Sequence, residues 1–590
     1  MITDPLQFYR QEKIILETEL SKLKKRLYTI STLRLIVFFS TISGIYFSLS
    51  NGLIVSIVAI VGFAIFAVLL FVNSKLQTEK QLLISKININ KTEISVLNGE
   101  FKNLNSGNEF VDPHHFYSND IDLFGVGSFF QYSNRTATKE GAQAYATLLT
   151  ENNIDQIEEK QKSIRELANK VKWRQHFSAI ASLVKVQFSS ASILRYIKNY
   201  TSVLPAYFVS FVKVFYVISI ALIIVISFDL VPFTILVIWF FIGLFISASQ
   251  LKKTNHIYNQ SSKAKETFKQ YYQLLSELEK QSFSSGLLKK NLQKLQSEKE
   301  KASVIFQKFS RILDSFDQRN NIIIAVVGNA LFLWDIQNAI KVEQWISKYK
   351  HTVESWFEVI TFFDAQNTLA NFSYNHPAFV APIISKKSTI IKATQLGHPL
   401  LNADKRIDND FVIDKEQFFI VTGANMAGKS TFLRTVSLTM VMANMGLPVC
   451  AETMEYNPIK LITSMRTSDS LADDESYFYS ELKRLKFIID KIETEDYFII
   501  LDEILKGTNS KDKAIGSKKF VEKLSNSKST GIIATHDVSL CELQEEFKDV
   551  ENYFFDAQIN DNELHFDYTL KKGICKNMNA SFLLKKMEII

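Results

Sequence analysis

Four long apolar runs constrain the fold of this 590-residue chain more than any other feature. They form two close pairs, residues 35–50 with 53–72 and residues 214–228 with 231–248. About 20 apolar residues span the hydrocarbon core of a bilayer, and runs of roughly 15 to 18 lie near the lower limit. Each pair is joined by a short turn without Lys or Arg. The pattern predicts two transmembrane helical hairpins, with buried core helices as the alternative, above all for the second pair.

Basic residues flank both pairs and set the expected orientation. Positively charged side chains are retained on the cytoplasmic side of a membrane, and a lysine at a helix end can extend its ammonium to the surface. We therefore expect a multi-pass protein of the inner (cytoplasmic) membrane, with four transmembrane helices and both termini in the cytoplasm. The flanking residues are Lys22, Lys24, Lys25, Arg26, Arg34, Lys75 and Lys80 for the first pair, and Lys213, Lys252 and Lys253 for the second.

The composition predicts long helices outside the membrane as well. Only 19 Gly and 9 Pro occur in the chain, which argues against an all-β fold. Residues 76–107 and 254–316 carry heptad-like Leu and Ile among Lys, Glu and Gln. They are interpreted as stalks or coiled-coil arms, or equally as solvated helices packed on a neighbour. A fifth apolar run, residues 322–333, is too short for a span and is expected to be a core helix.

The net charge and the cysteines exclude little more. Three cysteines cannot build a disulfide framework, so a reducing compartment is expected for most of the chain. The net charge of +7 permits an anionic partner but does not require one.

From about residue 390 the sequence changes to alternating short β-branched runs and helical stretches. The runs Phe418–Thr422, Tyr497–Leu501 and Gly531–Ala534 are expected to be strands of a parallel sheet. The main domain boundary is therefore predicted near residues 385–395.

A phosphate-binding loop follows the first of these strands. Residues 423–430 fit the pattern G-x-x-x-x-G-K-[ST], and the helical run 432–445 comes next. Glycines let such a loop wrap around phosphate, while backbone N–H groups and the helix N-terminus bind the anion. Lys429 would reach the β- and γ-phosphates, and Ser430 would ligate Mg²⁺.

Acidic and imidazole groups end the other two strands. Asp502 and Glu503 follow the strand at 497–501, and in such sheets this end lies beside the phosphate site. Asp502 would hold Mg²⁺ through water, and Glu503 would orient or deprotonate the attacking water. His536 follows the third strand and would sense the γ-phosphate. The order of these motifs is that of ABC-type ATPases.

These residues resemble the MutS family of mismatch-repair ATPases. Thr422–Arg434 resembles the family's phosphate loop with its distinctive Asn-Met pair, and Asp502–Ser510 resembles its D-E-[LI]-x-x-G-T segment. Ala534–His536 matches its A-T-H. The likeness is strong over residues 395–585 and weaker over 120–200 and 355–395.

The resemblance implies a site for ATP and Mg²⁺ shared between two protomers. Ser476 falls on the serine that completes the partner's site, so a homodimer through the ATPase domains is expected, with Glu503, His536 and Ser476 as catalytic residues. Ser430 and Asp502 would hold the metal. Arg406 stands where the family commonly stacks an aromatic residue on adenine. The phosphate-binding residues would be Gly423, Ala424, Asn425, Met426, Ala427, Gly428, Lys429, Ser430 and Thr431.

The chain also departs from the family. No N-terminal mismatch-reading domain is visible, and the family's Phe-x-Glu wedge occurs only at residues 520–522, inside the ATPase region. The first hairpin stands where the reading domain would be. Direct mismatch recognition is therefore not expected from this resemblance alone.

The expected fold is an α/β P-loop ABC-type ATPase domain at the C-terminus, preceded by an all-α helical core with two transmembrane hairpins. The function expected from it is a membrane-anchored MutS-like ATPase that works as a dimer and binds DNA. The alternative is a membrane ATPase for transport, remodelling or scaffolding without DNA. The expected segments are a cytoplasmic amphipathic helix (1–34), hairpin 1 (35–72), a core-like helical region (76–200), hairpin 2 (207–248), a helical arm with the rest of the core (254–390) and the ATPase domain (391–590).

Overall fold

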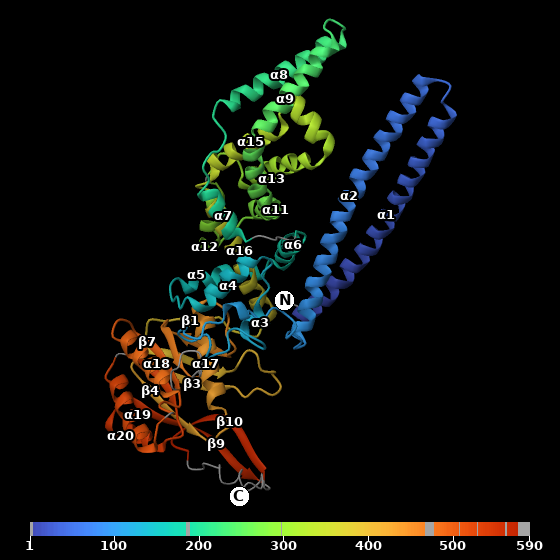
Figure 1. The fold of residues 1–590 in the computed structure, drawn as a ribbon. Coiled ribbons are helices and arrows are strands. Elements are labelled where there is room, and N and C mark those ends of the chain that lie inside the picture. Colours follow the sequence, from blue (N-terminus) through green and yellow to red (C-terminus); the bar gives the residue numbers. More distant parts are fainter. Residues whose placement is uncertain are drawn as a thin grey trace.

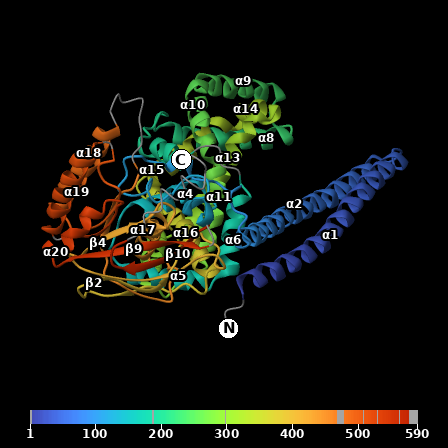
Figure 2. The same cartoon turned by 90° about the horizontal axis from the view of Figure 1, so that it is seen from below.

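The computed structural model describes residues 4–184, 189–296, 298–466, 477–506, 508–527, 529–560 and 563–575. A long N-terminal hairpin is followed by a helical body that carries a second hairpin, and then by a C-terminal α/β domain (Figure 1). In this view both hairpins rise on the same side of the molecule, and the α/β domain lies at the opposite end. Figure 2 shows the first hairpin leaving the body as a separate arm.

The first hairpin consists of α1 (Pro5–Phe47) and α2 (Gly52–Leu97). Asn51 caps α2, because its side-chain oxygen accepts the N–H of Leu53 at 3.1 Å. Both helices run unbroken through the segment boundaries expected at residues 34–35 and 72–76. The prediction of a helix reaching residue 107 is wrong, because α2 ends before Gly99, which adopts a positive φ of 88°.

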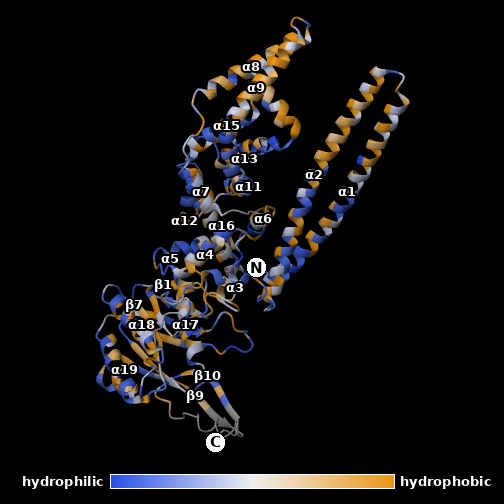
Figure 3. Ribbon diagram, viewed as in Figure 1, coloured by the Kyte–Doolittle hydropathy of each residue, from blue (hydrophilic) through white to orange (hydrophobic). Residues whose placement is uncertain are grey.

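The apolar halves of α1 and α2 are exposed, while their polar ends dock on the body (Figure 3). No residue of the most apolar stretch of α1 is buried, and in that of α2 the buried residue is Gly62, which faces Thr41 of α1; Phe39 is 61% exposed. By length and composition α1, α2 and α8 (Phe208–Ser227) are each able to cross a membrane. A fourth span is possible if α9 (Phe233–Ser249) and the following run Leu251–Glu279 are joined through their 61° bend.

The helical body is organised around α16 (Val353–Asn375), which contributes to two hydrophobic cores. Ala365, Leu369 and Phe372 pack in the core shared with the α/β domain, whereas Ile360 and Phe363 pack in the core of the body. The other helices of the body are α3 (Phe129–Ser133), α4 (Lys139–Thr150), α5 (Ile157–Ala168), α6 (Val171–Ser182), α7 (Ser190–Lys198), α10 (Leu251–Ser261), α11 (Lys265–Glu279), α12 (Gly286–Gln293), α13 (Ala302–Asp317) and α15 (Trp334–Tyr349).

A single long helix over residues 254–316 is a wrong prediction. The segment is divided among α10, α11, α12 and α13, with breaks at residues 262–264, 281–285 and 298–301. The cause is tertiary packing, because Phe268 of α11 contacts Phe306 and Phe309 of α13, and Phe309 stacks on Trp345 of α15 at 3.9 Å between ring centroids. Of the two interpretations, helices packed on a neighbour describe this segment.

The second hairpin is formed by α8 (Phe208–Ser227) and α9 (Phe233–Ser249). Trp239 of α9 stacks on Phe215 of α8 with 4.5 Å between ring centroids and donates to the hydroxyl of Ser219 at 2.8 Å. The turn between the helices contains Asp229 with a positive φ of 54°.

The run 322–333 is not a regular core helix, so that prediction is wrong. It forms a π-helical turn, η5 (Ile324–Gly328), and the short helix α14 (Asn329–Phe332) beside the second hairpin. A side chain at Gly243 of α9 would lie 1.8 Å from the carbonyl oxygen of Ala330, so the two backbones are in direct contact. Only the end of the run is buried, since Ile322 is 78% exposed.

The C-terminal domain contains two sheets. The six-stranded sheet has the order β10-β9-β4-β8-β7-β6, in which β9, β4, β8, β7 and β6 are parallel and β10 is antiparallel to β9. The four-stranded sheet has the order β1-β5-β2-β3. The strands are β1 (Ile383–Ile384), β2 (Thr389–Leu396), β3 (Asn409–Asp414), β4 (Phe418–Gly423), β5 (Thr453–Tyr456), β6 (Lys460–Ser464), β7 (Tyr497–Asp502), β8 (Thr530–Ala534), β9 (Val550–Asn560) and β10 (Glu563–Lys572).

The sheets are covered by α17 (Lys429–Asn444), α18 (Tyr477–Ile492), α19 (Ser510–Ser525) and α20 (Leu543–Glu546). The three strands predicted from the sequence are confirmed as β4, β7 and β8, and they are neighbours in the sheet. Because they are parallel, their carboxyl ends meet at one edge, where the candidate site lies.

Candidate functional site

The loop 424–428 joins the buried strand β4 to α17 and wraps around the start of that helix. Two glycines permit its path. Gly428 has a φ of 107°, and a side chain at Gly423, whose φ is 150°, would lie 2.7 Å from the carbonyl oxygen of Phe555. The first N–H groups of α17, like those of any helix, have no intrahelical partner, and Gly428 provides no side-chain cap for them. This arrangement suits an anion.

Lys429 folds back over this loop. Its ammonium donates to the carbonyl oxygens of Gly423 at 2.7 Å and Ala424 at 3.2 Å, and lies 3.2 Å from Nε2 of His536. The residue is only 6% exposed, and this burial lowers the pKa of the ammonium. The hydrogen-bond partners of this cation carry no full negative charge, and the carboxylates of Asp502 and Glu503 act on it only at longer range, so an incoming phosphate would supply a direct counter-charge.

Asp502 and Ser430 meet across the mouth of the loop. The Ser430 hydroxyl donates to Oδ2 of Asp502 at 2.7 Å. A hydroxyl and a carboxylate are hard oxygen ligands of the type that Mg²⁺ prefers, together with phosphate oxygens and water. The donor set therefore fits Mg²⁺ bound with a nucleotide.

Glu503 is held by three contacts beside this pair. Its N–H donates to the carbonyl oxygen of Ala534 at 2.9 Å, and Nε2 of His536 lies 2.8 Å from its Oε1. Lys506 lies 3.6 Å from its Oε2. The hydrogen bond from His536, followed by the charges of His536 and Lys506, lowers the pKa of Glu503 to about 2. The carboxylate therefore stays ionised. The backbone of Glu503 has a φ of 53°, a strained conformation of the kind found at functional sites.

Glu481 of α18 supports the loop after Glu503 from behind. Its buried carboxylate accepts the N–H groups of Leu505 at 2.5 Å and Lys506 at 3.0 Å. The position of Glu503 is therefore tied to α18, the helix that follows residue 476.

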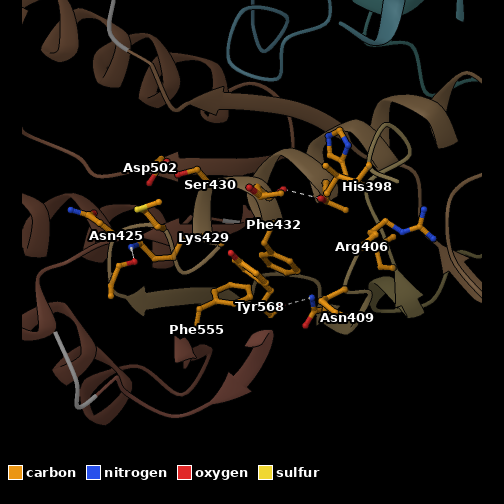
Figure 4. Close-up of a pocket in the computed structure, with 18 of the residues that line it drawn as sticks. His398, Arg406, Asn409, Asn425, Lys429, Ser430, Phe432, Asp502, Phe555 and Tyr568 are labelled. Carbon is orange, nitrogen blue, oxygen red and sulfur yellow. Dashed lines mark hydrogen bonds between the residues drawn. The ribbon is translucent and has the colours of Figure 1, made fainter. Parts of the chain in front are cut away.

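These groups surround one cavity of about 560 Å³ (Figure 4). Lys429, Ser430 and Asp502 lie at one end, and His398, Arg406 and Asn409 lie at the other, with Phe432 and Tyr568 between them. Glu503 and His536 line the same cavity. Of the nine loop residues predicted to bind phosphate, Gly423 and Ala427 shape the loop without lining the cavity, whereas the others line it.

Arg406 lines the cavity but is engaged by a neighbour. Its Nε and Nη2 donate to the Asp408 carboxylate at 2.5 and 3.1 Å, and these hydrogen bonds raise the pKa of the guanidinium. Tyr568 of β10 was missed by sequence reasoning, yet this residue is 43% exposed and lies between the phosphate loop and Arg406. Asn409 holds it there, donating to the Tyr568 carbonyl at 3.1 Å and accepting the N–H of Leu570 at 2.7 Å.

His398 was also not predicted as a lining residue. Burial, with the nearby charges of Arg434 and Arg406, lowers its pKa to about 4, so the ring is neutral. The remaining predicted residue, Ser476, lies outside the described residues, and its placement stays a prediction.

Comparison with known proteins links the domain that carries this cavity to one family. Residues 419–586 match the family model MutS domain V. MutS protein homolog 4 of Homo sapiens is 30% identical over 229 residues, which are 37% of this chain and 24% of that protein. DNA mismatch repair protein MutS of Phocaeicola vulgatus is 30% identical over 206 residues, 33% of this chain and 23% of that protein.

A longer match has lower identity. DNA mismatch repair protein MutS of Staphylococcus haemolyticus is 27% identical over 270 residues, 44% of this chain and 30% of that protein. The chain thus spans less than a third of the length of these relatives. The C-terminal part of this chain is therefore similar to MutS proteins, and a helical region followed by mixed α/β sheets fits MutS-like domains.

Proposed function

We propose that the C-terminal domain binds ATP with Mg²⁺ and hydrolyses it. The observation that carries the proposal is the convergence of Lys429, Ser430, Asp502, Glu503 and His536 on one cavity. A basic phosphate loop, a hydroxyl–carboxylate pair and an ionised carboxylate are the parts that phosphoryl transfer to water requires.

Each residue would have a distinct role. The loop N–H groups and Lys429 would bind the β- and γ-phosphates, and Ser430 with Asp502 would hold Mg²⁺, which offsets the phosphate charge. Glu503 is a poor proton acceptor while its pKa is held near 2 by His536. We therefore infer that His536 turns from Glu503 towards the γ-phosphate in the active arrangement, which frees Glu503 to orient water.

The nucleobase would lie between the phosphate loop and Arg406. We assign stacking to Tyr568, because its ring is exposed while the Arg406 guanidinium is paired with Asp408. Arg406 remains at the rim of the cavity, so it is available to contact the ribose or base edge.

The membrane arrangement is part of the same proposal. Both hairpins would span the inner membrane, with the ATPase domain and both termini in the cytoplasm. The exposed apolar halves of the helices support this, as does the position of the α/β domain at the opposite end from the hairpin turns. Water would solvate so much apolar surface at a high free-energy cost.

Assembly and DNA binding follow from the relatives. We propose a homodimer through the ATPase domains, with Ser476 completing the partner's site. Two relatives are named DNA mismatch repair proteins, which supports a role on DNA. The exposed hairpins favour a second candidate function, a membrane ATPase for transport, remodelling or scaffolding that does not bind DNA.

Two variants and a matched control test ATP hydrolysis in the detergent-solubilised full chain. Glu503→Gln should keep ATP binding and lower turnover by at least about 10²-fold, as expected when a positioned carboxylate is lost. Lys429→Met should abolish ATP binding. Lys415→Met, at the opposite end of β4 and paired with Asp496, should change neither. Normal hydrolysis by Glu503→Gln would remove Glu503 from its assigned role.

The choice between the two candidate functions rests on the ATPase rate with and without duplex DNA across a salt series. Stimulation that fades with salt supports DNA as a partner. A rate unchanged by perfect and mismatched duplexes at low salt supports the membrane function instead.

A further inference from the structure

A groove of about 400 Å³ lies where the second hairpin leaves the helical body, between α8 and α15. Its α8 wall is formed by Val209, Val212, Lys213, Tyr216 and Val217, which recur on one helix face. This wall continues directly into the exposed apolar surface of α8, where Val214 and Val217 are 58% and 64% exposed.

The opposite wall is amphipathic. Ile340 of α15 is 8% exposed and closes the floor, while Lys341 and Gln344 are exposed at the rim. A helix with such polar groups on its outer face would not enter hydrocarbon, because they would lose water without gaining partners. The groove therefore lies at the level where α8 would leave the hydrocarbon of a bilayer and reach its polar surface.

The charge of the groove is positive and uncompensated. Lys213 and Lys341 are its two cationic residues, and neither has a salt bridge or hydrogen bond to any described residue. No acidic residue is among the groove-lining residues, all of which are described. Glu343, two positions after Lys341, faces away and accepts the N–H of Val203 at 2.7 Å and the hydroxyl of Tyr200 at 2.8 Å.

We propose that this groove binds one anionic phospholipid at the cytoplasmic surface of the membrane. The phosphate takes the place between Lys213 and Lys341, and the side-chain amide of Gln344 at the rim is placed beside it to donate a hydrogen bond, whereas the amide of Gln337 already donates to the carbonyl oxygen of Phe332 at 3.0 Å. One acyl chain follows α8 over Val212 and Val217 into the bilayer. The inference rests on the proposed membrane insertion of the second hairpin. Basic pockets beside membrane helices recognise anionic headgroups in this way.

Lipid titration of the detergent-purified full chain, followed by native mass spectrometry, tests the site. The probes are phosphatidylglycerol and phosphatidylcholine with identical acyl chains. A lysine near the surface contributes about fivefold in affinity for an anionic lipid, so two should give a preference of about 25-fold for phosphatidylglycerol. Lys213→Gln with Lys341→Gln should reduce that preference to near unity.

The matched control is Lys252→Gln with Lys253→Gln, which removes the same charge just after α9, the second helix of the hairpin. It should keep the preference. Equal loss in both double variants would mean diffuse attraction and overturn the site. Equal binding of the two lipids by the unaltered chain would overturn it as well, as would displacement of phosphatidylglycerol by millimolar inorganic phosphate.

Failure of the site and failure of the proposed membrane insertion are separable. Cell membranes washed with sodium carbonate retain integral proteins. A chain that stays in the washed membrane but shows no lipid preference overturns only the lipid site. A chain released by carbonate overturns the membrane part of the proposed function and the lipid site with it.

Discussion

Glu93→Ala should detach the base of the first hairpin from the helical body. Glu93 lies on α2 and is 1% exposed. Its carboxylate accepts from Nε of Arg135 at 2.7 Å and from the side-chain amides of Asn371 and Asn375 at 3.1 and 2.8 Å. Tyr9 of α1 donates to the Asn375 amide oxygen at 2.8 Å, so both helices of the hairpin are tied to the end of α16.

The expected magnitude follows from burial. Removing one partner of a buried ion pair costs about 3–5 kcal/mol, because the remaining charge loses its compensation. Each 1.4 kcal/mol is a factor of ten, so amide exchange in residues 86–97 should accelerate by at least about 10²-fold. Hydrogen–deuterium exchange measures this locally and does not require the whole chain to unfold in one step. Glu93→Gln should accelerate exchange less than Glu93→Ala, because its side chain keeps one acceptor oxygen.

Glu79→Ala is the matched control, since Glu79 is an exposed residue of the same type on α2. It should leave exchange in residues 86–97 unchanged. The reasoning is refuted if Glu93→Ala exchanges like this control, because the hairpin would then be held by its apolar contacts alone.

Three further perturbations test other parts of the structure. Burial lowers the pKa of His376 to about 4, so the contribution of its neutral ring to folding stability is complete above pH 6.5 and declines by about 2 kcal/mol at pH 5. His376→Gln should therefore reduce the loss in Tm between pH 7.5 and pH 5. An unchanged loss would contradict this. Gly243→Val should lower the Tm in detergent because its side chain meets the Ala330 carbonyl, whereas Gly52→Ala, with open space around it, should not; equal effects would exclude the backbone contact. Tyr568→Ala should weaken ATP binding by about 1–3 kcal/mol in a direct binding assay while Tyr568→Phe retains it, and an unaffected alanine variant would place the base elsewhere.

The polar end of the cavity was predictable because its parts are local or lie at equivalent strand ends. The loop before Lys429 requires only a strand, a glycine-rich turn and a helix in direct succession. Asp502 ends a buried strand, Glu503 follows that strand and His536 follows another, and parallel pairing of those strands brings their ends together. No long-range packing has to be known to place these groups side by side.

The rest of the cavity depends on pairing that the sequence does not display. Tyr568 reaches the middle of the cavity through the antiparallel pairing of β10 with β9, whose register shifts between Phe566 and Leu570. Asn409, far earlier in the chain, then fixes the Tyr568 carbonyl. A lone tyrosine in a polar strand carries no local signal for a base-binding role. The same limit explains the division of residues 254–316, because contacts with the distant α15 decide where those helices stop.

The position of α16 bears on the choice between the candidate functions. Its C-terminal end holds the first hairpin through Asn371 and Asn375, and its buried Asp364 accepts the N–H and hydroxyl of Thr138 at 2.9 and 2.7 Å. The chain passes from α16 directly to β1 and β2, and Leu369 and Phe372 pack in the same core as those sheets. A movement of the two sheets of the C-terminal domain would therefore displace the base of the first hairpin.

This contact between α16 and the hairpin predicts different results for the two candidate functions. If the membrane is only an anchor for a protein that acts on DNA, loosening the hairpin with Glu93→Ala should leave the ATPase rate unchanged. If ATP drives work on the membrane, the same variant should uncouple the C-terminal domain from the first hairpin. The ATPase rate would then lose its dependence on the surrounding lipid. Measurement of the rate in detergent and in lipid nanodiscs, for the unaltered chain and for Glu93→Ala, separates these outcomes. Glu79→Ala, which leaves the docking contacts in place, shows whether any change comes from the lost charge alone.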